Sequence, residues 1–448
     1  MSYVDRIIAA TESKNADQPE FLQAVREVLN SLRFIVEEDD SYEKAGILER
    51  LVEPERVVMF RVPWVDDEGK VQVNRGYRVQ FNSAIGPYKG GLRFHPSVNL
   101  SIIKFLGFEQ TLKNSLTGLP IGGGKGGADF DPKGKSDGEI MRFCQSFVTE
   151  LYRYIGPNKD CPAGDIGVGG KEIGYMYGQY KRIRGEYEAG AFSGKGISYG
   201  GSLGRTEATG YGAVYFTQEY FQSIGEEIKG KTFAISGFGN VAWGVCKKVN
   251  ELGGKVVTLS GPDGYIYDKD GVTGDKVDYL VEMRNSNRDL VKDYADKYHV
   301  EYHEGEKPWG KVHADIYMPC ATQNDVRKED ALHILEEGHC KILIEVANMP
   351  TTQDAMDLLM ENGIVVLPSK AVNAGGVAVS ALEMAQNAEK LSWSKEEVDE
   401  KLKDIMKNIF CNIAEAAKQS GCEGNYVAGA NLAGFRKVAE AMIGQGVC

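Results

Sequence analysis

Short apolar runs alternate with helical stretches between residues 230 and 368, and this alternation restricts the fold more than any other feature of the chain. The runs "KTFAIS", "KVVTLSG", "ADIYMP", "KILIEVAN" and "GIVVLPS" contain few charged residues, as strands buried on both faces do. The stretch "VAWGVCKKVNELGG", between the first two runs, has helical periodicity and ends at glycines. Strands that alternate with helices indicate a doubly wound parallel sheet, so we predict an α/β fold.

The residues outside this region predict further elements. Residues 1–60 are mainly helical, because apolar residues in "PEFLQAVREVLNSLRFIVEE" recur near a 3.6-residue period. Strand-like runs follow to residue 86, helices are expected around 99–116 and 136–155, and residues 377–419 are again helical. The glycine-rich segment "SYGGSLGR" separates the two patterns. The sequence therefore predicts two domains with a boundary near residues 200–205.

Composition excludes several classes of partner. The formal charge is -12, from 64 acidic and 52 basic residues, whereas nucleic acids and anionic membranes require a basic face. No apolar run approaches the roughly 18–20 residues of a transmembrane helix, and the N-terminus has no signal-peptide core, so we expect a cytoplasmic protein. The eight cysteines form no Cys-x-x-Cys pair and histidine is sparse, so we expect neither a metal site nor a disulfide framework.

The segment "GFGNVA", Gly237 to Ala242, matches the G-x-G-x-x-G/A pattern of dinucleotide-binding turns. It follows a predicted strand and opens a predicted helix, as that pattern requires. The first glycine allows a tight turn, the second lets the backbone approach a pyrophosphate, and the helix N-terminus attracts the anion. These features predict a Rossmann-like dinucleotide-binding domain. A plain strand–turn–helix glycine motif is the alternative interpretation.

The choice of nicotinamide cofactor depends on the position that contacts the adenosine ribose, about 20 residues further on at the end of the next strand. The sequence has Ser260 at that strand end and Asp263 in the following turn. No Arg or Lys lies between Ser260 and Tyr267 to pair with the 2′-phosphate of NADP, and Asp263 would repel it. These residues favour NAD. Because Ser260 stands where an acid is usual, NADP or the use of both cofactors stays open.

Five glycines flank Lys125 in "GGGKGG", a composition that suggests a phosphate-binding loop. The Walker A pattern would require glycine at Leu119 and serine or threonine at Gly126, so the segment is not a P-loop. Residues 81–128 nevertheless hold five cations against one acid, Glu109; the cations are Lys89, Arg93, Lys104, Lys113 and Lys125.

This cluster predicts a pocket for a small, multiply anionic molecule, with solvated surface lysines as the alternative. Lys89 and Lys125 both lie in glycine-flanked segments, where the backbone can approach a ligand closely. Crowding by other cations and partial desolvation lower the pKa of a lysine, so Lys125 could act as a general base, or stabilise an oxyanion when protonated. Asp165, in "CPAGDIGVGG", is the nearest plausible acidic partner, unless it is simply a turn aspartate.

Longer segments carry a resemblance to a known family. They are "GPYKGGLRFHPSVN", "TLKNSLTGLPIGGGKGGADFDPKGKSD", "PAGDIGVGGKEIGYMYGQY", "RTEATGYG", "SGFGNVAWG", "MPCATQND", "EVANMPTT" and "PSKAVNAGGVAVSALEM". In matching order through nearly the whole chain, they resemble the hexameric glutamate dehydrogenases of the Glu/Leu/Phe/Val dehydrogenase superfamily. The resemblance implies a homohexamer that catalyses reversible, NAD(P)-dependent oxidative deamination of L-glutamate to 2-oxoglutarate and ammonium.

The resemblance also implies three regions with separate roles. A substrate-binding and oligomerisation domain is expected over 1–202 and a dinucleotide-binding domain over 203–425. A C-terminal helix over 426–448 is expected to return to the first domain.

The resemblance further assigns roles to particular residues of this chain. Lys125 would activate water and stabilise the carbinolamine, and Asp165 would carry protons to and from the amino nitrogen. Lys113, with Gln110 beside it, matches the α-carboxylate site, while Lys89 and Ser380 match the group that holds the side-chain carboxylate. The other implied substrate-binding positions are Gly90, Gly164, Arg205 and Val377. The implied cofactor-binding positions are Thr209, Gly237, Phe238, Gly239, Asn240, Val241, Ser260, Asp263, Ala321, Asn348 and Asn373.

Three other functions are alternatives to that of a glutamate dehydrogenase. A dehydrogenase of leucine, valine or phenylalanine would present apolar groups where Lys89 and Ser380 stand, since an unpaired lysine facing an apolar side chain is costly. A nucleotide-binding regulator without chemistry would be expected to lack Lys125 or Asp165, and both are present. A P-loop phosphotransferase is disfavoured by the failed Walker A pattern.

Overall fold

The computed structural model describes residues 1–286, 288 and 290–447, which form two compact units. The first comprises Met1–Leu203, Val377–Val398 and Asn431–Cys448, and the second comprises Gly204–Gly376 and Asp399–Ala430. The segment Val377–Val398 differs from the sequence-based division, which placed it in the dinucleotide-binding domain. It packs with the first unit, where Glu383 forms a buried ion pair with Lys195.

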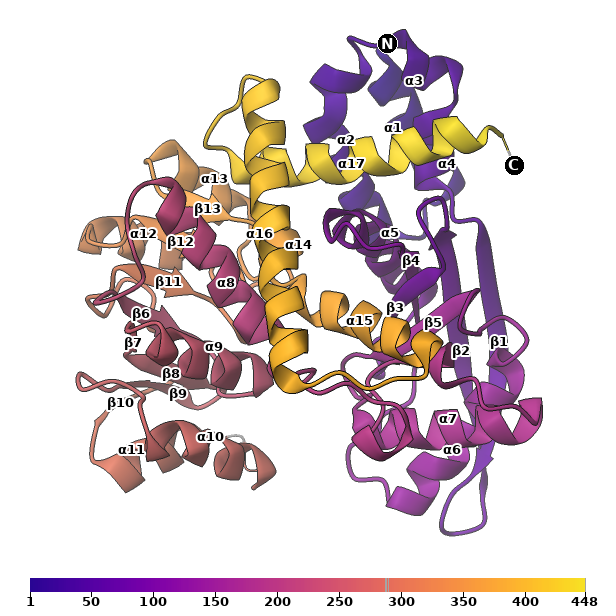
Figure 1. Ribbon diagram of the computed structural model, residues 1–448, viewed down its shortest axis with the longest axis horizontal. Helices are drawn as coiled ribbons and strands as arrows, with labels where there is room; N and C mark the ends of the chain where they lie inside the picture. Colours follow the sequence, from indigo (N-terminus) through magenta and orange to yellow (C-terminus); the bar gives the residue numbers. More distant parts are fainter. Residues whose placement is uncertain (287, 289, 448) are drawn as a thin grey trace. The chain divides into compact units, whose positions relative to one another are not determined.

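The first unit is built around a five-stranded sheet with the strand order β1-β2-β4-β3-β5 (Figure 1). Strands β1 and β2 form a long antiparallel hairpin, β2 pairs antiparallel with β4, and β3 lies parallel between β4 and β5. The strands are β1 Arg56–Val65, β2 Val71–Asn82, β3 Tyr88–Phe94, β4 Gly122–Ala128 and β5 Asp160–Gly164.

Helices surround this sheet and supply most of its core. A buried aromatic cluster joins β1, β3 and α6, with Phe94 and Phe143 at its centre. The helices are α1 Tyr3–Lys14, α2 Pro19–Val36, α3 Asp40–Lys44, α4 Ile47–Val52, α5 Leu100–Leu116, α6 Asp137–Leu151, α7 Gly170–Arg184 and the 3-10 turns η1 Ala189–Ala191 and η2 Ile197–Tyr199. Helix α15, Gly375–Glu389, joins this unit from Val377 onward.

Strand β4 is the segment "GGGKGGA", in which every residue is buried. Its glycines are needed for close packing: a Cβ atom on Gly123 would lie 1.9 Å from Oγ1 of Thr111 in α5. On the neighbouring strand β3, a Cβ on Gly90 would lie 1.7 Å from the carbonyl oxygen of Gly124. The interpretation of this segment as a glycine-rich loop is therefore wrong. Lys125 extends from a strand whose neighbours leave no room for side chains on the adjoining residues.

The second unit contains a five-stranded parallel sheet with the order β13-β12-β11-β6-β7. The predicted doubly wound α/β fold is thereby confirmed, since helices connect successive strands (Figure 1). The strands are β6 Thr232–Ile235, β7 Lys255–Val256, β11 Ile316–Met318, β12 Ile342–Ile344 and β13 Val365–Leu367. The helices are α8 Ala208–Ser223, α9 Asn240–Glu251, α10 Asp275–Asn285, α12 Lys328–Glu337, α13 Gln353–Glu361, α14 Ser369–Val372 and most of α16 Lys395–Gln419.

The run "KVVTLSG" does not form one strand, as the sequence predicts, but two. After β7 the chain enters a separate three-stranded antiparallel sheet of order β10-β9-β8. Its strands are β8 Thr258–Gly261, β9 Gly264–Tyr267 and β10 Glu301–Glu304, and the short helix α11 Lys292–Tyr298 precedes β10.

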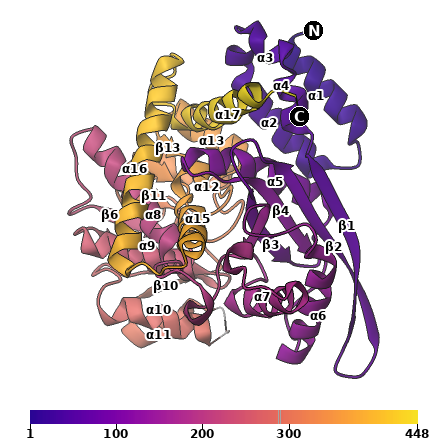
Figure 2. The ribbon, with the colours of Figure 1, turned by 45° about the vertical axis from the view of Figure 1, so that its right-hand side comes forward.

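Helix α17, Tyr426–Gln445, belongs to the first unit from Asn431 onward. Asn431 donates a hydrogen bond to Oγ of Ser31 in α2 at 2.9 Å, and Ser115 of α5 donates to the carbonyl oxygen of Gly434 at 3.0 Å. Figures 1 and 2 both show the helix beside α2 and α4. Helix α17 therefore packs against α2 and α5 of the first unit.

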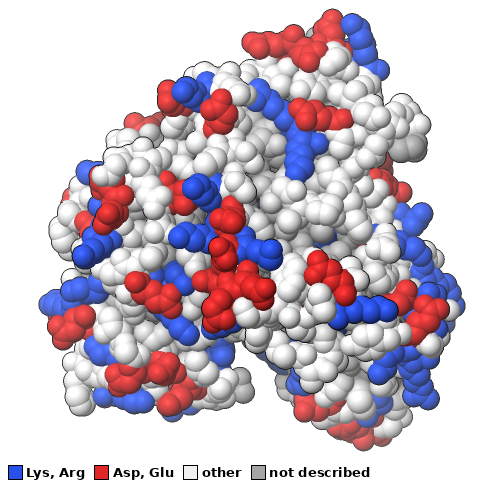
Figure 3. Space-filling view, in the orientation of Figure 1, with Lys and Arg blue, Asp and Glu red and all other residues white. Residues whose placement is uncertain are grey.

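Acidic and basic side chains alternate over the face drawn in Figure 3, and no continuous basic surface covers it. No described helix is both long and apolar enough to cross a membrane. Within the described ranges, no group of His, Cys, Asp and Glu side chains could hold a metal ion.

Candidate active site

Lys125 and Asp165 meet in the first unit. Nζ of Lys125, in β4, lies 3.2 Å from Oδ2 of Asp165, which directly follows β5. Nε of Arg93, in the intervening strand β3, donates to the same oxygen at 2.8 Å. The side chains of Lys125 and Asp165 are 7% and 17% exposed. Two neighbouring strands thus bring two cations onto one oxygen of Asp165, whose side chain is partly exposed.

These contacts shift the pKa of both groups. Burial lowers the pKa of Lys125, Asp165 opposes that change, and the positive charges of Arg93 and Arg78 lower it further. Burial alone would raise the pKa of Asp165, but Lys125 and Arg93 outweigh it and hold the pKa below its ordinary value. A lysine with a lowered pKa beside an ionised carboxylate can exchange protons with a ligand.

Lys89, in β3, is completely buried. Its ammonium donates to Oγ of Ser193 at 2.7 Å and to the carbonyl oxygen of Cys161 at 2.9 Å. A buried ammonium requires such oxygen acceptors, because it has lost its hydration shell. Sequence reasoning missed Ser193, since 104 residues separate it from Lys89 and no spacing pattern links them.

Helix α5 carries Gln110 and Lys113 and is fixed to the strands by Asn114. The side-chain amide of Asn114 donates to the carbonyl oxygens of Lys89 in β3, at 3.1 Å, and of Gly122 in β4, at 2.6 Å. Gln110 in turn donates to Oδ1 of Asn114 at 2.6 Å. The last turn of α5, which includes Lys113, is therefore held against the strands that carry Lys89 and Lys125.

Lys104, which the sequence groups with these cations, lies elsewhere in the unit. Its Nζ donates to Oδ1 of Asn15 at 2.7 Å and stands 4.1 Å from the centre of the Phe21 ring. Burial lowers its pKa. Lys104 therefore joins the N-terminal helices to α5, and its inclusion in the predicted pocket is wrong.

The other implied substrate positions of the first unit lie on neighbouring elements. Gly90 pairs with Pro162 across β3 and β5, and Gly164 ends β5 next to Asp165. Val377 and Ser380 lie on α15, where Ser380 is 1% exposed.

In the second unit, the predicted dinucleotide turn joins β6 to α9. Gly237 has a φ of 82°, a left-handed conformation that favours glycine. A Cβ on Gly239, the N-cap of α9, would meet no atom within 4 Å, so the space beside this backbone is open to a ligand. The turn and the helix N-terminus therefore fit a pyrophosphate group. Phe238, Asn240 and Val241 complete the turn and the first helical positions.

The carboxyl ends of β6 and β11 are joined by Ser236, whose Oγ accepts from the backbone N–H groups of Cys320, at 3.0 Å, and Ala321, at 3.2 Å. Beyond β12 and β13, Asn373 donates to Oδ1 of Asn348 at 2.8 Å. Oδ1 of Asn373 is buried and accepts no hydrogen bond from any residue that the structure describes. A ligand N–H group would satisfy it, which is consistent with an amide-bearing cofactor at this edge.

Arg205 and Thr209 lie together near the start of α8. A Cβ on Gly376 would stand 2.5 Å from Oγ1 of Thr209 and 3.8 Å from Nη1 of Arg205. Both side chains therefore border the backbone of Gly376 in the second unit.

Ser260 and Asp263, the predicted ribose-end residues, both have structural partners. Oγ of Ser260 accepts from the backbone N–H of Gly237 at 3.1 Å and so fixes the dinucleotide turn. The Asp263 carboxylate accepts from the backbone N–H groups of Val291, at 2.9 Å, and Lys292, at 3.0 Å. This charge lies next to the turn, because a Cβ on Gly261 would stand 2.6 Å from Oδ1 of Asp263 and 3.0 Å from Cε1 of Phe238.

Two cations near this end lie outside the segment Ser260–Tyr267, where the sequence predicts the ribose contact. The backbone N–H of Lys292 donates to the carboxylate of Asp263. The guanidinium of Arg284, in α10, contacts Oδ1 of Asn240. The absence of Arg and Lys between Ser260 and Tyr267 therefore does not describe every cation near the ribose end.

Comparison with known proteins agrees with this geometry. The family model described as Glu/Leu/Phe/Val dehydrogenase, dimerisation domain matches residues 54–182, and the model for Glutamate/Leucine/Phenylalanine/Valine dehydrogenase matches 200–446. An NAD-specific glutamate dehydrogenase of Clostridium symbiosum is 61% identical over 447 residues, 99% of each chain. An NADP-specific glutamate dehydrogenase of Giardia intestinalis is 54% identical, over 99% of this chain and 98% of that one. A solved glutamate dehydrogenase structure, 61% identical, superposes with a TM-score of 0.98 and covers 100% of this chain and 99% of its own.

Proposed function

The chain belongs to the Glu/Leu/Phe/Val dehydrogenase family, and we propose that it is a glutamate dehydrogenase. It converts L-glutamate, water and oxidised nicotinamide cofactor reversibly to 2-oxoglutarate, ammonium, reduced cofactor and a proton. The observation that carries the proposal is the contact between Lys125 and Asp165, in a unit that also buries the Lys89 ammonium. The identity of 61% with a glutamate dehydrogenase over the full chain supports it.

Lys125 acts as the general base in this proposal. In its neutral form it takes a proton from the water that attacks the imine carbon, and once protonated it stabilises the carbinolamine oxygen. Asp165 moves protons to and from the substrate nitrogen, for which its partial exposure and its position 3.2 Å from Lys125 suit it. The nicotinamide, when bound, supplies the hydride acceptor.

The two carboxylates of glutamate require two separate cations. We assign Lys113, in the last turn of α5, to the α-carboxylate, and Lys89 with Ser380 to the side-chain carboxylate. Gln110, Gly90, Gly164, Val377 and Arg205 are proposed to line the substrate. The fixed attachment of α5 through Asn114 keeps the two lysines at a constant separation, which selects a dicarboxylate of one length.

We propose NAD as the preferred cofactor. The Asp263 carboxylate beside Phe238 places a negative charge at the ribose end, which repels a 2′-phosphate. NADP is the alternative cofactor, since Lys292 donates its backbone N–H to Asp263 and the Arg284 guanidinium contacts Asn240 at the start of α9. Thr209, the turn Gly237–Val241, Ser260, Ala321, Asn348 and Asn373 are the other proposed cofactor-binding residues.

We also propose a homohexamer located in the cytoplasm. The β1–β2 hairpin exposes Met59, Val71 and Val73, and adjacent apolar side chains at a surface mark contacts between chains. The family model over this hairpin is described as a dimerisation domain. The cysteines in the described part of the chain are all free thiols, as in a reducing compartment. Light scattering should give a mass six times 49.2 kDa.

Initial rates of 2-oxoglutarate amination with NADH and with NADPH, measured side by side, test the activity and the cofactor together. Faster turnover with NADH supports both assignments. Comparable or faster turnover with NADPH keeps the enzyme but shows that Asp263 does not exclude the 2′-phosphate. No turnover with either cofactor contradicts the proposal, and faster oxidation of leucine than of glutamate would move the chain to a sister enzyme.

The substrate assignment has its own test in Lys89→Leu. Removing the cation should lower activity on glutamate relative to norvaline, which has a methyl group in place of the distal carboxylate, by about 100-fold or more. Steady-state kinetics with both amino acids measure this ratio. An unchanged ratio would show that Lys89 does not contact the substrate.

A further inference from the structure

We propose that Glu383, through its ion pair with Lys195, fixes the ammonium of Lys89 and is thereby a positioning residue for the distal carboxylate of the substrate. This inference rests on the proposed function, because it concerns the specificity of the same site. The buried ion pair between Glu383 and Lys195 takes no part in the proposed chemical steps.

Glu383 and Lys195 form one of the most deeply buried ion pairs in the described part of the molecule. Nζ of Lys195 lies 2.6 Å from Oε1 of Glu383, and the two side chains are 0% and 1% exposed. A buried ion pair adds little net stability, because desolvating both charges offsets their attraction. The pair joins residues 188 positions apart, so it is well placed to fix one segment relative to another.

The carboxylate also holds the backbone beside Ser193. One oxygen accepts from the N–H of Gly194 at 2.9 Å, and the other accepts from the N–H of Lys195 at 3.3 Å. Ser193 itself donates its N–H to the carbonyl oxygen of Pro162 in β5 at 3.0 Å. Since the Ser193 hydroxyl accepts from the Lys89 ammonium at 2.7 Å, the position of that ammonium depends on Glu383.

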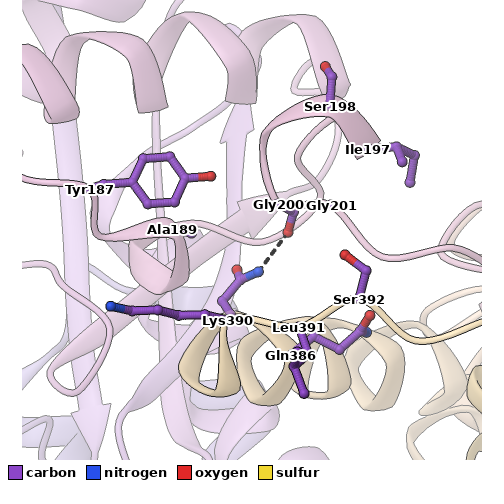
Figure 4. A pocket seen from close by; sticks show the side chains of 11 residues that line it. Tyr187, Ala189, Ile197, Ser198, Gly200, Gly201, Gln386, Lys390, Leu391 and Ser392 are labelled. Atoms are coloured by element: carbon purple, nitrogen blue, oxygen red, sulfur yellow. Dashed lines mark hydrogen bonds between the residues drawn. The ribbon is translucent and has the colours of Figure 1, made fainter.

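Helix α15 extends this attachment beyond Glu383. Lys195 donates to Oδ1 of Asn387 at 2.9 Å, and Asn387 donates to the carbonyl oxygen of Gly200 at 2.8 Å, at the edge of a pocket of about 320 Å³ (Figure 4). Ser380, the second proposed partner of the distal carboxylate, stands one helical turn before Glu383. One carboxylate therefore sets the positions of Lys89, through Ser193, and of Ser380, through the helix.

The test compares catalytic efficiencies on glutamate and on norvaline in three variants. Glu383→Gln removes the counter-charge of Lys195, whereas Ser193→Ala removes only a hydroxyl and leaves the Glu383–Lys195 ion pair in place. The third variant combines the two changes. We expect each change to lower the glutamate-to-norvaline ratio about tenfold, mainly through KM for glutamate. Because Glu383 acts on Lys89 through Ser193, the loss in the double variant should be smaller than the two single losses combined.

Asp268→Asn is the matched control. Asp268 is also 1% exposed, and it pairs with Lys276 at 2.7 Å in the second unit. This variant should lower the melting temperature as Glu383→Gln does, but leave the substrate ratio unchanged. An unchanged ratio in Glu383→Gln or in Ser193→Ala, or a ratio that falls equally in the control, overturns the inference. A wild-type protein that does not oxidise glutamate would instead refute the proposed function.

Discussion

Strand β5 begins with Asp160 and is directly followed by Asp165. The surroundings of these two carboxylates differ sharply. Asp160 is completely buried and forms a two-point contact with the guanidinium of Arg78, with Nε at 2.9 Å. Gln80 donates to it as well, at 3.0 Å. Asp165 is 17% exposed, and both of its cations, Lys125 and Arg93, meet a single oxygen.

The difference separates a structural charge pair from a reactive one. The Arg78 guanidinium matches both oxygens of Asp160 in a fixed planar geometry. Lys125 is a single-point donor whose pKa is lowered by burial, and its carboxylate partner remains accessible. At the two ends of β5, the carboxylate that is fully buried and paired through both oxygens is structural. The carboxylate that is partly exposed and meets two cations through one oxygen is the reactive one.

Lys125→Ala breaks the reactive pair and should have the largest effect. Turnover is expected to fall by about 10³-fold or more, because both the base and the cation that stabilises the carbinolamine oxygen are lost. Binding of NADH should be largely kept, which a fluorescence titration can measure beside the steady-state rate. Turnover near the wild-type value would remove Lys125 from the mechanism.

Asp160→Asn breaks the structural pair. It leaves the Arg78 charge buried without a counter-charge, so unfolding should cost about 3–5 kcal/mol less than in the wild type. Thermal or denaturant unfolding measures this loss. A stability equal to that of an Asp165→Asn control would contradict the division drawn between the two ends of β5.

Arg93→Gln sharpens the comparison by changing the neighbour of the reactive pair. A nearby cation disfavours protonated lysine, so removing Arg93 should raise the pKa of Lys125. The neutral, basic form then appears at higher pH, and the rising limb of the kcat profile should shift in that direction. This is the smallest expected effect. A limb that is unmoved or displaced to lower pH would exclude Arg93 as a determinant of that pKa.

The sequence predicts much of this arrangement, because several of its signals are local. The alternation of strands and helices and the turn at Gly237 depend on neighbouring residues, so the parallel sheet could be foreseen. The sequence offers Asp165, in its glycine-rich setting, as the nearest plausible acidic partner of Lys125, with a turn aspartate as the alternative, and the structure brings the two within 3.2 Å.

The features that sequence reasoning missed depend on contacts between distant segments. Asp160 lies 82 residues from Arg78, and Glu383 lies 188 residues from Lys195, so no periodicity or spacing connects them. The strand at Lys125 was mistaken for a loop because its glycines satisfy steric limits set by α5 and β3. Such limits appear only once the chain is folded.

The return of α17 to the first unit has a consequence for protein synthesis. Residues 1–203 emerge from the ribosome well before residues 377–398 and 431 onward, which complete the same unit. At about 5–20 residues per second, the nascent unit waits roughly ten to fifty seconds for its last helix. During that interval the surface around Ser115 that Gly434 will cover is exposed. A chaperone that protects nascent chains would therefore be expected to engage this protein at its N-terminal half.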